Sequence, residues 1–216
     1  MFYAYEGADG CGKNTIADAV AEVLQAERLD FPNDAGVTGP SIRSYLRKEW
    51  GVMKRPTTAL DKWTGALALQ SMMLVNRLEV YPRLVLAKET DRHLVIARYW
   101  QSGWVYGQLD GLSPDWLYST HAVLPKPTCT FFLDVPAEVC MERRARRDGD
   151  KMPEIYEGKL AFTQKVVDLY RSLFKMLCIN DASYAIIDGT QPIDVIVAEC
   201  VAKARAAVYA SHEAQH

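Results

Sequence analysis

The sequence predicts an α/β fold in which a parallel sheet is flanked by helices on both faces, and three observations support this. Short apolar runs alternate with longer segments of helical periodicity, and strands that alternate with helices form parallel sheets. The length of 216 residues corresponds to one domain. The composition, with 49% hydrophobic residues, is typical of a globular chain and excludes a disordered one.

The first quarter of the chain predicts one strand and two helices. Residues 2–5 form an apolar run that is too short for an amphipathic helix. Residues 15–26 carry apolar side chains at helical spacing, namely Ile16, Val20, Val23 and Leu24. Ser41 is a typical residue for the start of a second helix, and Gly51 for its end.

The middle of the chain predicts a long helix, a strand and a capped helix. Residues 59–88 keep a helical pattern, with a bend expected near Pro82. Residues 94–97 form the next buried strand. Ser113 followed by Pro114 is typical of a helix cap with proline at the first helical position.

The last third of the chain predicts two strands and three helices. Residues 130–133 form a strand, and Pro136 opens a helix directly after it, with Asp134 expected as the capping side chain. Residues 143–153 (RRARRDGDKMP) form the least regular segment of dense charge. The remaining elements are a helix over 156–177, a strand over 185–187 and a helix over 192–209.

Charge and cysteine content narrow the classes of partner. The formal net charge of −2 leaves no basic footprint for a nucleic-acid polymer, although a small anionic ligand needs only a local basic cluster. The five cysteines are widely spaced without a C-x-x-C pair, which favours a reducing compartment. No signal-peptide pattern is present and no apolar run approaches the ~18 residues of a membrane span. We therefore expect a cytoplasmic protein with no membrane partner.

Residues 7–15 (GADGCGKNT) contain the strongest motif. They follow a predicted strand, open a predicted helix and match G-x-x-x-x-G-K, the phosphate-binding P-loop. Glycines let backbone N–H groups converge on phosphate oxygens, and the helix amino end adds partial positive charge. Lys13 would reach the β- and γ-phosphates. Asn14 stands where a Ser or Thr usually binds magnesium, and Thr15 follows it.

Further motifs, in order along nearly the whole chain, resemble those of the thymidylate kinase family. They are EGADGCGKNT (6–15), Phe31-Pro32, Asn76-Arg77, Arg98-Tyr99 with Ser102-Gly103 and Tyr106, LPKP (124–127), FLDV (132–135), EIYE (154–157) and IDGTQ (187–191). The resemblance implies a P-loop NTPase-type fold, with residues 1–216 forming one nucleoside-monophosphate kinase domain and a short Arg-rich lid at about 143–155. It implies transfer of the γ-phosphoryl group of ATP to dTMP, with Mg²⁺, by a homodimer.

The resemblance also implies roles for individual residues. Phosphoryl transfer requires two anionic substrates held in line and their charge neutralised. The implied catalytic residues are Lys13, Arg98, Arg143 and Arg147. The implied ATP-binding residues are Gly10, Gly12, Lys13, Asn14, Thr15, Arg146, Thr190 and Gln191. The implied acceptor-binding residues are Asp9, Phe31, Met73, Arg77, Arg98, Ser102, Gly103, Tyr106 and Tyr156, with Arg77 and Arg98 on the acceptor phosphate and Asp9 also a candidate metal ligand.

Several positions depart from the family pattern. Ala97 replaces the Asp of the family's D-R pair, and Met73 stands where the family usually has a Phe that stacks on thymine. A methionine fills space but lacks a stacking face. Trp100 and Trp104 are expected to add bulk nearby, so we expect a reshaped pocket for the acceptor base. The four histidines show no ligand spacing and receive no role.

Three alternatives to dTMP phosphorylation stay open. The acceptor could be another deoxynucleoside monophosphate, such as dUMP or a 5-modified pyrimidine nucleotide. A deoxynucleoside kinase shares the P-loop, although two arginines for an acceptor phosphate argue against it. A catalytically inactive nucleotide-binding protein would account for Ala97 and Asn14.

Overall fold

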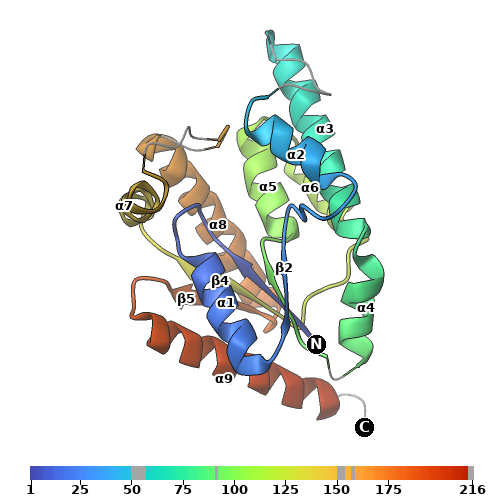
Figure 1. Ribbon diagram of the computed structural model, residues 1–216, viewed down its shortest axis with the longest axis vertical. Helices are drawn as coiled ribbons and strands as arrows, with labels where there is room; N and C mark the ends of the chain where they lie inside the picture. The colour runs from blue at the N-terminus through green and yellow to red at the C-terminus, as the bar shows by residue number, and fades with distance from the viewer. Residues whose placement is uncertain (50–56, 91, 150–153, 157–158, 214–216) are drawn as a thin grey trace.

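A five-stranded parallel sheet forms the centre of the molecule (Figure 1). The computed structural model describes residues 1–49, 57–90, 92–149, 154–156 and 159–213, with backbone alone for 209–213. The strand order is β2-β3-β1-β4-β5, and every pairing is parallel. The bounds are β1 Phe2–Glu6, β2 Glu27–Asp30, β3 Leu94–Ala97, β4 Cys129–Asp134 and β5 Tyr184–Asp188. The predicted fold class is confirmed.

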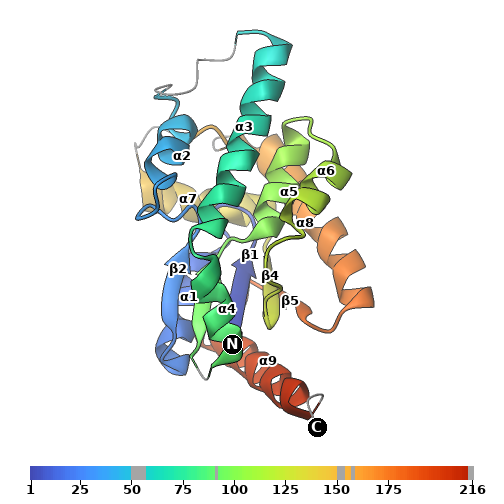
Figure 2. The ribbon, with the colours of Figure 1, turned by 90° about the vertical axis from the view of Figure 1, so that its right-hand side faces the viewer.

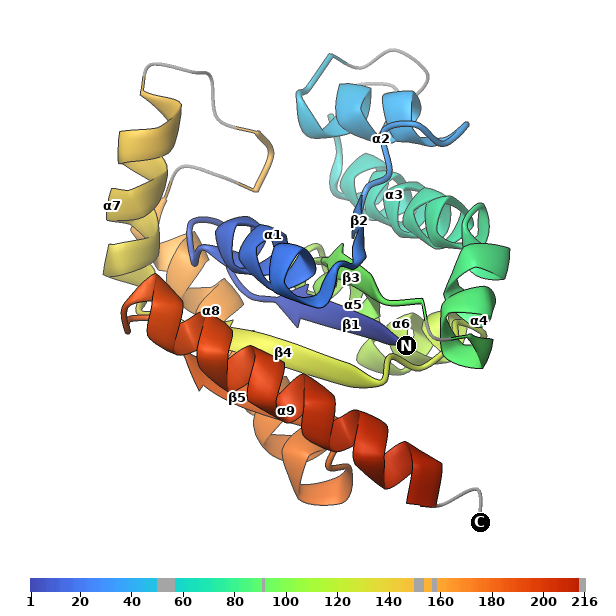
Figure 3. The same ribbon diagram turned by 60° about the horizontal axis from the view of Figure 1, so that its bottom comes forward.

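Two helices cover one face of the sheet and three lie on the other. Helices α1 (Lys13–Leu24) and α9 (Ile193–Glu213) pack together and against the strands. On the opposite face, α8 (Leu160–Asn180) packs on β4 and β5, α5 (Trp100–Leu109) packs on α8, and α4 (Tyr81–Glu89) packs on β1. Figure 3 shows α1 and α9 in front of the sheet, with α5 and α8 behind it. The central strands β1 and β3 are buried along their whole length because both faces are covered.

The remaining helices lie beyond or beside the carboxyl edge of the sheet. Figure 2 shows α2 (Gly39–Leu46) and α3 (Ala59–Leu78) rising past the edge to which β1 points. Helix α3 starts with a capping box between Thr58 and Asp61. Helix α6 (Pro114–His121) packs on α5, and α7 (Ala137–Asp148) packs on α8. In the described part of the chain, no helix is long and apolar enough to cross a membrane.

The cap of α6 is confirmed, but several predicted boundaries were wrong. Ser113 accepts a hydrogen bond from the Trp116 amide at 3.4 Å. The predicted helix over 59–88 is two helices, since α3 ends at Leu78 and α4 begins at Tyr81 with proline in its first turn. Helix α2 begins at Gly39 instead of at Ser41, because Thr38 is its N-cap residue.

Two elements have no signal in the sequence. Strand β2 (ERLD) lies at the sheet edge, where only Leu29 is buried, so it lacks an apolar run. Helix α5 is buried on most of its surface and therefore has no amphipathic stripe. The expected irregular segment at 143–153 was wrong for residues 143–148, which continue α7; residues 150–153 lie outside the described residues.

Asp134 does not cap the helix after β4. The N-cap of α7 is Pro136, with no side-chain hydrogen bond. The Asp134 carboxylate instead accepts two hydrogen bonds from Arg171 Nε, at 2.9 and 3.1 Å. Because its side chain is long, Arg171 on α8 reaches Asp134, and this ion pair takes the place of a capping contact. The ion pair links α8 to the end of β4.

Candidate active site

The carboxyl ends of all five strands lie at one edge of the sheet, where ligands bind in open α/β folds. Two cavities lie at this edge, of about 350 Å³ and about 450 Å³. They share Lys13, Asn14 and Arg147. We call the larger one the P-loop cavity and the smaller one the acceptor cavity, after the residues described below.

The glycines of the loop after β1 are required by its backbone. Gly10 has φ +91°, and a Cβ there would lie 2.0 Å from the Cys140 carbonyl oxygen. Gly12 has φ +95° and is the N-cap residue of α1. Both conformations favour glycine, and they bring the loop against α7 with the amino end of α1 facing the cavity. This is the geometry that cradles a phosphate.

The P-loop cavity gathers most of the predicted ATP-binding residues. Its described lining comprises Gly10, Cys11, Gly12, Lys13, Asn14, Thr15, Ile16, Arg143, Arg147, Gly189, Gln191, Ile193 and Ile196. Arg143 Nη1 donates to the carbonyl oxygens of Cys11 at 3.2 Å and Gly189 at 3.0 Å. One side chain of α7 therefore bridges the loops after β1 and β5.

Two predicted ATP-binding side chains lie elsewhere. Arg146 is 76% exposed and pairs with Glu142, four residues earlier on α7, because it lies on the solvent side of that helix. Thr190 donates from its amide and hydroxyl to Asp188 Oδ1, at 2.9 and 2.6 Å, and closes the turn after β5. Neither belongs to the described lining of the two cavities.

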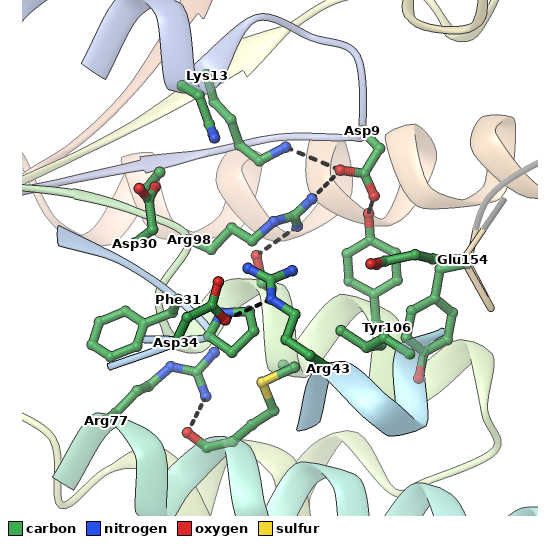
Figure 4. A pocket seen from close by; sticks show the side chains of 18 of the residues that line it. Asp9, Lys13, Asp30, Phe31, Asp34, Arg43, Arg77, Arg98, Tyr106 and Glu154 are labelled. Atoms are coloured by element: carbon green, nitrogen blue, oxygen red, sulfur yellow. Dashed lines mark hydrogen bonds and ion pairs between the residues drawn. The ribbon is translucent and has the colours of Figure 1, made fainter. Parts of the chain in front are cut away.

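Asp9 lies among three donors where the two cavities meet. Lys13 Nζ is 3.4 Å from Asp9 Oδ1, Arg98 Nη2 donates to the same oxygen, and the Tyr106 hydroxyl donates to Oδ2 at 3.3 Å (Figure 4). Burial alone would raise the pKa of the Asp9 carboxyl. The positive charges of Arg98 and Lys13 instead hold this pKa well below the usual carboxyl range. Asp9 is therefore ionised at neutral pH.

Arg98 follows β3 in a left-handed conformation with φ +65°. Such a φ is costly for a residue other than glycine and persists only where surrounding contacts enforce it. The Arg98 amide donates to the Tyr5 carbonyl at 2.9 Å, and Nη1 donates to Ser102 Oγ at 3.4 Å. Burial lowers the pKa of Arg98, but the Asp9 carboxylate raises it well above its ordinary value. The structure thus holds a permanent cation at the cavity.

Buried Glu6 at the end of β1 orders the start of α5, a contact that the sequence did not suggest. It accepts from the Tyr99 amide at 2.6 Å and from the Ser102 amide at 3.2 Å and hydroxyl at 2.7 Å. The Tyr170 hydroxyl donates to it at 2.9 Å. Glu6 therefore fixes the segment that carries Arg98 and Ser102.

Arg77 lies at the other end of the acceptor cavity, past Phe31 (Figure 4). Its guanidinium is 5.6 Å from the centre of the Phe31 ring, and it donates to the carbonyl oxygens of Tyr99 at 2.6 Å and Met73 at 3.1 Å. Arg77 and Arg98 line the same cavity, and a joint hold on one acceptor phosphate stays a prediction. The two terminal nitrogens of Arg77 donate to protein carbonyls, and its Nε has no partner among the described residues.

The predicted acceptor residues otherwise converge on one cavity. Phe31, Met73, Ser102, Gly103, Tyr106 and Tyr156 all line it with Asp9 and Arg98. The Tyr156 ring packs tilted against the Tyr106 ring with centres 4.9 Å apart, and its hydroxyl donates to Asp110. Burial raises the pKa of the Asp110 carboxyl to about 6.

Trp100 and Trp104 do not reshape the pocket. Trp100 packs edge-on against Tyr118, and Trp104 packs beside the cluster of Ala66, Leu112 and Leu117. Neither belongs to the described lining of the acceptor cavity. Both side chains point between helices because α5 is buried on most sides.

Sequence reasoning missed five polar residues that line the acceptor cavity, namely Asp30, Asp34, Arg43, Gln70 and Glu154. Arg43 Nε is 2.6 Å from Asp34 Oδ1. Gln70 precedes Met73 by three residues and Arg77 by seven. That spacing places the three on one helix face and was a signal available in the sequence.

Oxygen groups near the shared residues fit a magnesium ion. Magnesium is usually held by one or two carboxylates together with substrate phosphates and water. Asp9 and Asn14 line the acceptor cavity, and Thr15, which carries a hydroxyl group, lines the P-loop cavity. Among the described residues, no group of three or more His, Cys, Asp or Glu side chains surrounds a metal site. The phosphates of the bound nucleotides would therefore supply most ligands of the magnesium ion.

Comparison with known proteins identifies the family. The family model described as thymidylate kinase matches residues 5–200. The chain belongs to the thymidylate kinase family. It is 31% identical to a probable thymidylate kinase of Methanococcus maripaludis, covering 92% of each chain. It is 27% identical to the thymidylate kinase of Dictyostelium discoideum, covering 91% of this chain and 81% of the relative.

A solved structure extends the likeness to the fold. The thymidylate kinase from Candida albicans superposes with a TM-score of 0.71 over 92% of this chain and 88% of that one, at 24% identity. Thymidylate kinases are phosphotransferases, so this family member belongs to that class of enzyme.

In this chain, Ala97 is the last residue of β3, and it lies opposite Asp30 of β2 in the parallel register.

Proposed function

We propose that this thymidylate kinase family member transfers the γ-phosphoryl group of ATP to dTMP, giving ADP and dTDP. The observation that carries the proposal is the junction of two cavities at a P-loop lysine, with an arginine cation facing the acceptor side. A donor phosphate on the P-loop and an acceptor phosphate near Arg98 would meet there. That arrangement is what in-line phosphoryl transfer requires.

In the proposed reaction, an acceptor phosphate oxygen forms a bond to the γ-phosphorus as the bond to the β,γ-bridging oxygen breaks. Lys13 and the loop amides hold the ATP phosphates, and Arg98 holds the acceptor phosphate. The guanidinium carries five N–H donors, so Arg98 can keep its bond to Asp9 and still bind a phosphate. Bound Mg²⁺ would neutralise phosphate charge, with Asp9, Asn14 and Thr15 as candidate nearby oxygen ligands.

Other predicted roles follow from the same placement. Asp9 would orient Arg98 and accept a hydrogen bond from the sugar hydroxyl of the acceptor. Arg143 and Arg147, on one helix, would close over the transferred group. The lid around them and the homodimer stay predictions; residues 150–153 of the lid lie outside the described residues.

A second candidate acceptor is dUMP or a 5-modified pyrimidine deoxynucleotide. Met73 lines the acceptor cavity beside Phe31, so the base would pack on a flexible side chain there, not on an aromatic ring. A methionine tolerates changes at the 5-position better than a rigid ring does.

The test is ADP release from ATP and Mg²⁺ with a panel of acceptors, namely dTMP, dUMP, 5-hydroxymethyl-dUMP, dCMP, dGMP, dAMP and thymidine. We expect the highest kcat/KM with dTMP. A higher value with dUMP or the modified nucleotide would make the second candidate the function. Turnover of thymidine alone would indicate a nucleoside kinase. ATP binding with no turnover across the panel would overturn the proposal.

A further inference from the structure

The strand beside β1 ends without a carboxylate. In P-loop NTPases, Mg²⁺ is held by a hydroxyl residue of the loop and by an Asp from outside the loop. Here β3, which pairs with β1, ends in Ala97, and Asn14 follows the P-loop lysine. The methyl group of an alanine cannot bind a cation. A carboxylate for the metal therefore has to come from another element.

Asp30 brings a carboxylate to the same level of the sheet. It is the last residue of β2, and it pairs with Ala97 across the parallel ladder. Both residues line the acceptor cavity together with Asn14. Neighbouring strands lie about 4.8 Å apart, and Mg²⁺ usually keeps several of its waters. A carboxylate that is one strand further away can therefore hold the ion through a water molecule.

One oxygen of Asp30 is free to accept a further hydrogen bond. Its Oδ1 accepts from Arg28 Nη2 at 2.9 Å, and no described residue donates to Oδ2. The side chain is 50% exposed, so water reaches it. The carboxylate of Asp9, in contrast, is already shared by three donors. Figure 4 shows Asp9 and Asp30 on opposite sides of the Arg98 side chain.

Arg28 holds Asp30 without cancelling the negative charge around it. Its Nε also donates to Asp18 of α1 at 2.8 Å, so one guanidinium serves two carboxylates. One negative charge therefore remains in this group of three side chains. A carboxylate beside nucleotide phosphates repels them unless a cation lies between the two. The position of Asp30 in the lining of a phosphate cavity thus favours a cation there.

We propose that Asp30 holds the Mg²⁺ of bound ATP through a bridging water, in place of the carboxylate that Ala97 lacks. The inference rests on the proposed function, since it takes ATP as the donor, and deepens it. Asn14 would face the same ion from the loop side. Asp30 is a positioning residue in this role, because it acts on the metal through water and does not touch the reacting atoms.

The test measures ATP binding by calorimetry, once in EDTA and once with excess Mg²⁺, without any acceptor. Asp30→Asn keeps the shape of the side chain and removes its charge, and Asp30→Ser is a second variant should the first fail to fold. Asp18→Asn is the matched control, because Asp18 pairs with the same Arg28 but is absent from the described lining of both cavities. Circular dichroism checks the folding of each variant.

The measured quantity is the factor by which Mg²⁺ tightens the binding of ATP. We expect this factor to fall about tenfold or more in Asp30→Asn, since groups that act through the ligands of a metal commonly contribute about 10–100-fold to its affinity. In EDTA, the same variant should bind ATP at least as tightly as the unaltered chain, because a repelling carboxylate is gone. Asp18→Asn should keep the factor within about twofold, because an exposed ion pair is worth little.

Returning a carboxylate to β3 gives an independent check. Ala97→Asp, introduced into the Asp30→Asn variant, should restore most of the lost factor. An unchanged factor in both Asp30 variants would overturn the proposal, and so would an equal loss in Asp18→Asn. Weaker ATP binding in EDTA and in Mg²⁺ alike would indicate a structural role of Asp30 and would also overturn it.

These affinities do not depend on turnover. If no acceptor of the panel were phosphorylated, the proposed function would fail, while the effect of Mg²⁺ on ATP binding would still decide the role of Asp30. If dTMP were phosphorylated and the factor were unchanged in the Asp30 variants, the kinase function would stand and the role of Asp30 would be rejected.

Discussion

Asp9 and the two cations around it show how single residues set the charge of the site. Lys13 is only 5% exposed and Arg98 is bound to the same carboxylate oxygen. A lone carboxylate among phosphates would repel them, but here one anion is shared by two cations. The local charge is therefore positive, which suits two phosphate-bearing ligands.

Replacing Lys13 with methionine should separate chemistry from folding. Methionine fills a similar volume but cannot neutralise the transferred phosphate, and losing one such group commonly costs about 100-fold or more in kcat. We expect kcat in Lys13→Met to fall by at least that factor, with the circular-dichroism spectrum unchanged. A fully active or an unfolded variant would show that Lys13 has another role.

His121 should make stability depend on pH. Burial and the positive charge of Arg77 lower its pKa from 6.5 to about 4. The folded state therefore binds fewer protons than the unfolded chain between these values. The contribution of neutral His121 to the free energy of unfolding is therefore fully present above pH 6.5, and it is lost as the pH falls through about 4.

We expect His121 to account for about 2–3 kcal/mol of the stability lost between pH 7 and pH 4.5. Urea denaturation at both pH values, for the unaltered chain and for His121→Gln, measures this contribution. The variant should lose less stability over the same interval. Equal losses in both would exclude His121 as the cause.

Helix α7 determines which arginines reach the P-loop cavity. Arg143 and Arg147 are four residues apart and share a face, whereas Arg146 pairs with Glu142 in solvent. The helix continues through Asp148, so the run of positive charge is divided between the cavity and the solvent. Local sequence composition cannot show this division.

Paired substitutions on α7 test this division. Arg143→Gln should raise the KM for ATP about tenfold, because charge-assisted hydrogen bonds contribute about 1.5–3 kcal/mol. The same change at Arg146 should leave the KM for ATP within about twofold, since an exposed pair is worth little. A larger effect at Arg146 than at Arg143 would reverse the assignment.

At the scale of the whole molecule, the parallel sheet brings distant segments to one edge. The segments that follow β1, β3 and β5 supply Lys13, Arg98 and Gln191, which are far apart in sequence. Ligands at this edge would contact several elements at once. They should therefore stabilise the folded chain as a unit.

Nucleotide binding should raise the melting temperature. A ligand at about 100 times its Kd adds about 2.7 kcal/mol, which corresponds to roughly 5–10 °C for a chain of this size. We expect such shifts with ATP and with dTMP added singly, measured by differential scanning fluorimetry. Lys13→Met should reduce the shift with ATP, and no shift with either nucleotide would contradict both proposed sites.

The sequence by itself determined the fold class, the phosphate loop and the family. Buried central strands and the loop glycines follow local rules of hydrophobicity and backbone conformation, so a short stretch of sequence is enough to predict them. The resemblance to the family likewise implied one site for Arg98, Ser102 and Tyr106, and all three line the acceptor cavity. Strand β2 and helix α5 were not predicted, because an edge strand and a helix that is buried on most of its surface lack the periodic contrast on which such rules depend.

Only the tertiary structure decided which side chains meet. Glu6 orders Tyr99 and Ser102 across more than ninety residues, and Arg77 lies over the ring of Phe31 and donates to the Tyr99 carbonyl. The unpaired carboxamide of Gln70 exists only because Gly103 and His121 on other helices enclose it. Hydrogen bonding and burial between distant segments depend on how helices pack, and no single stretch of sequence contains that information.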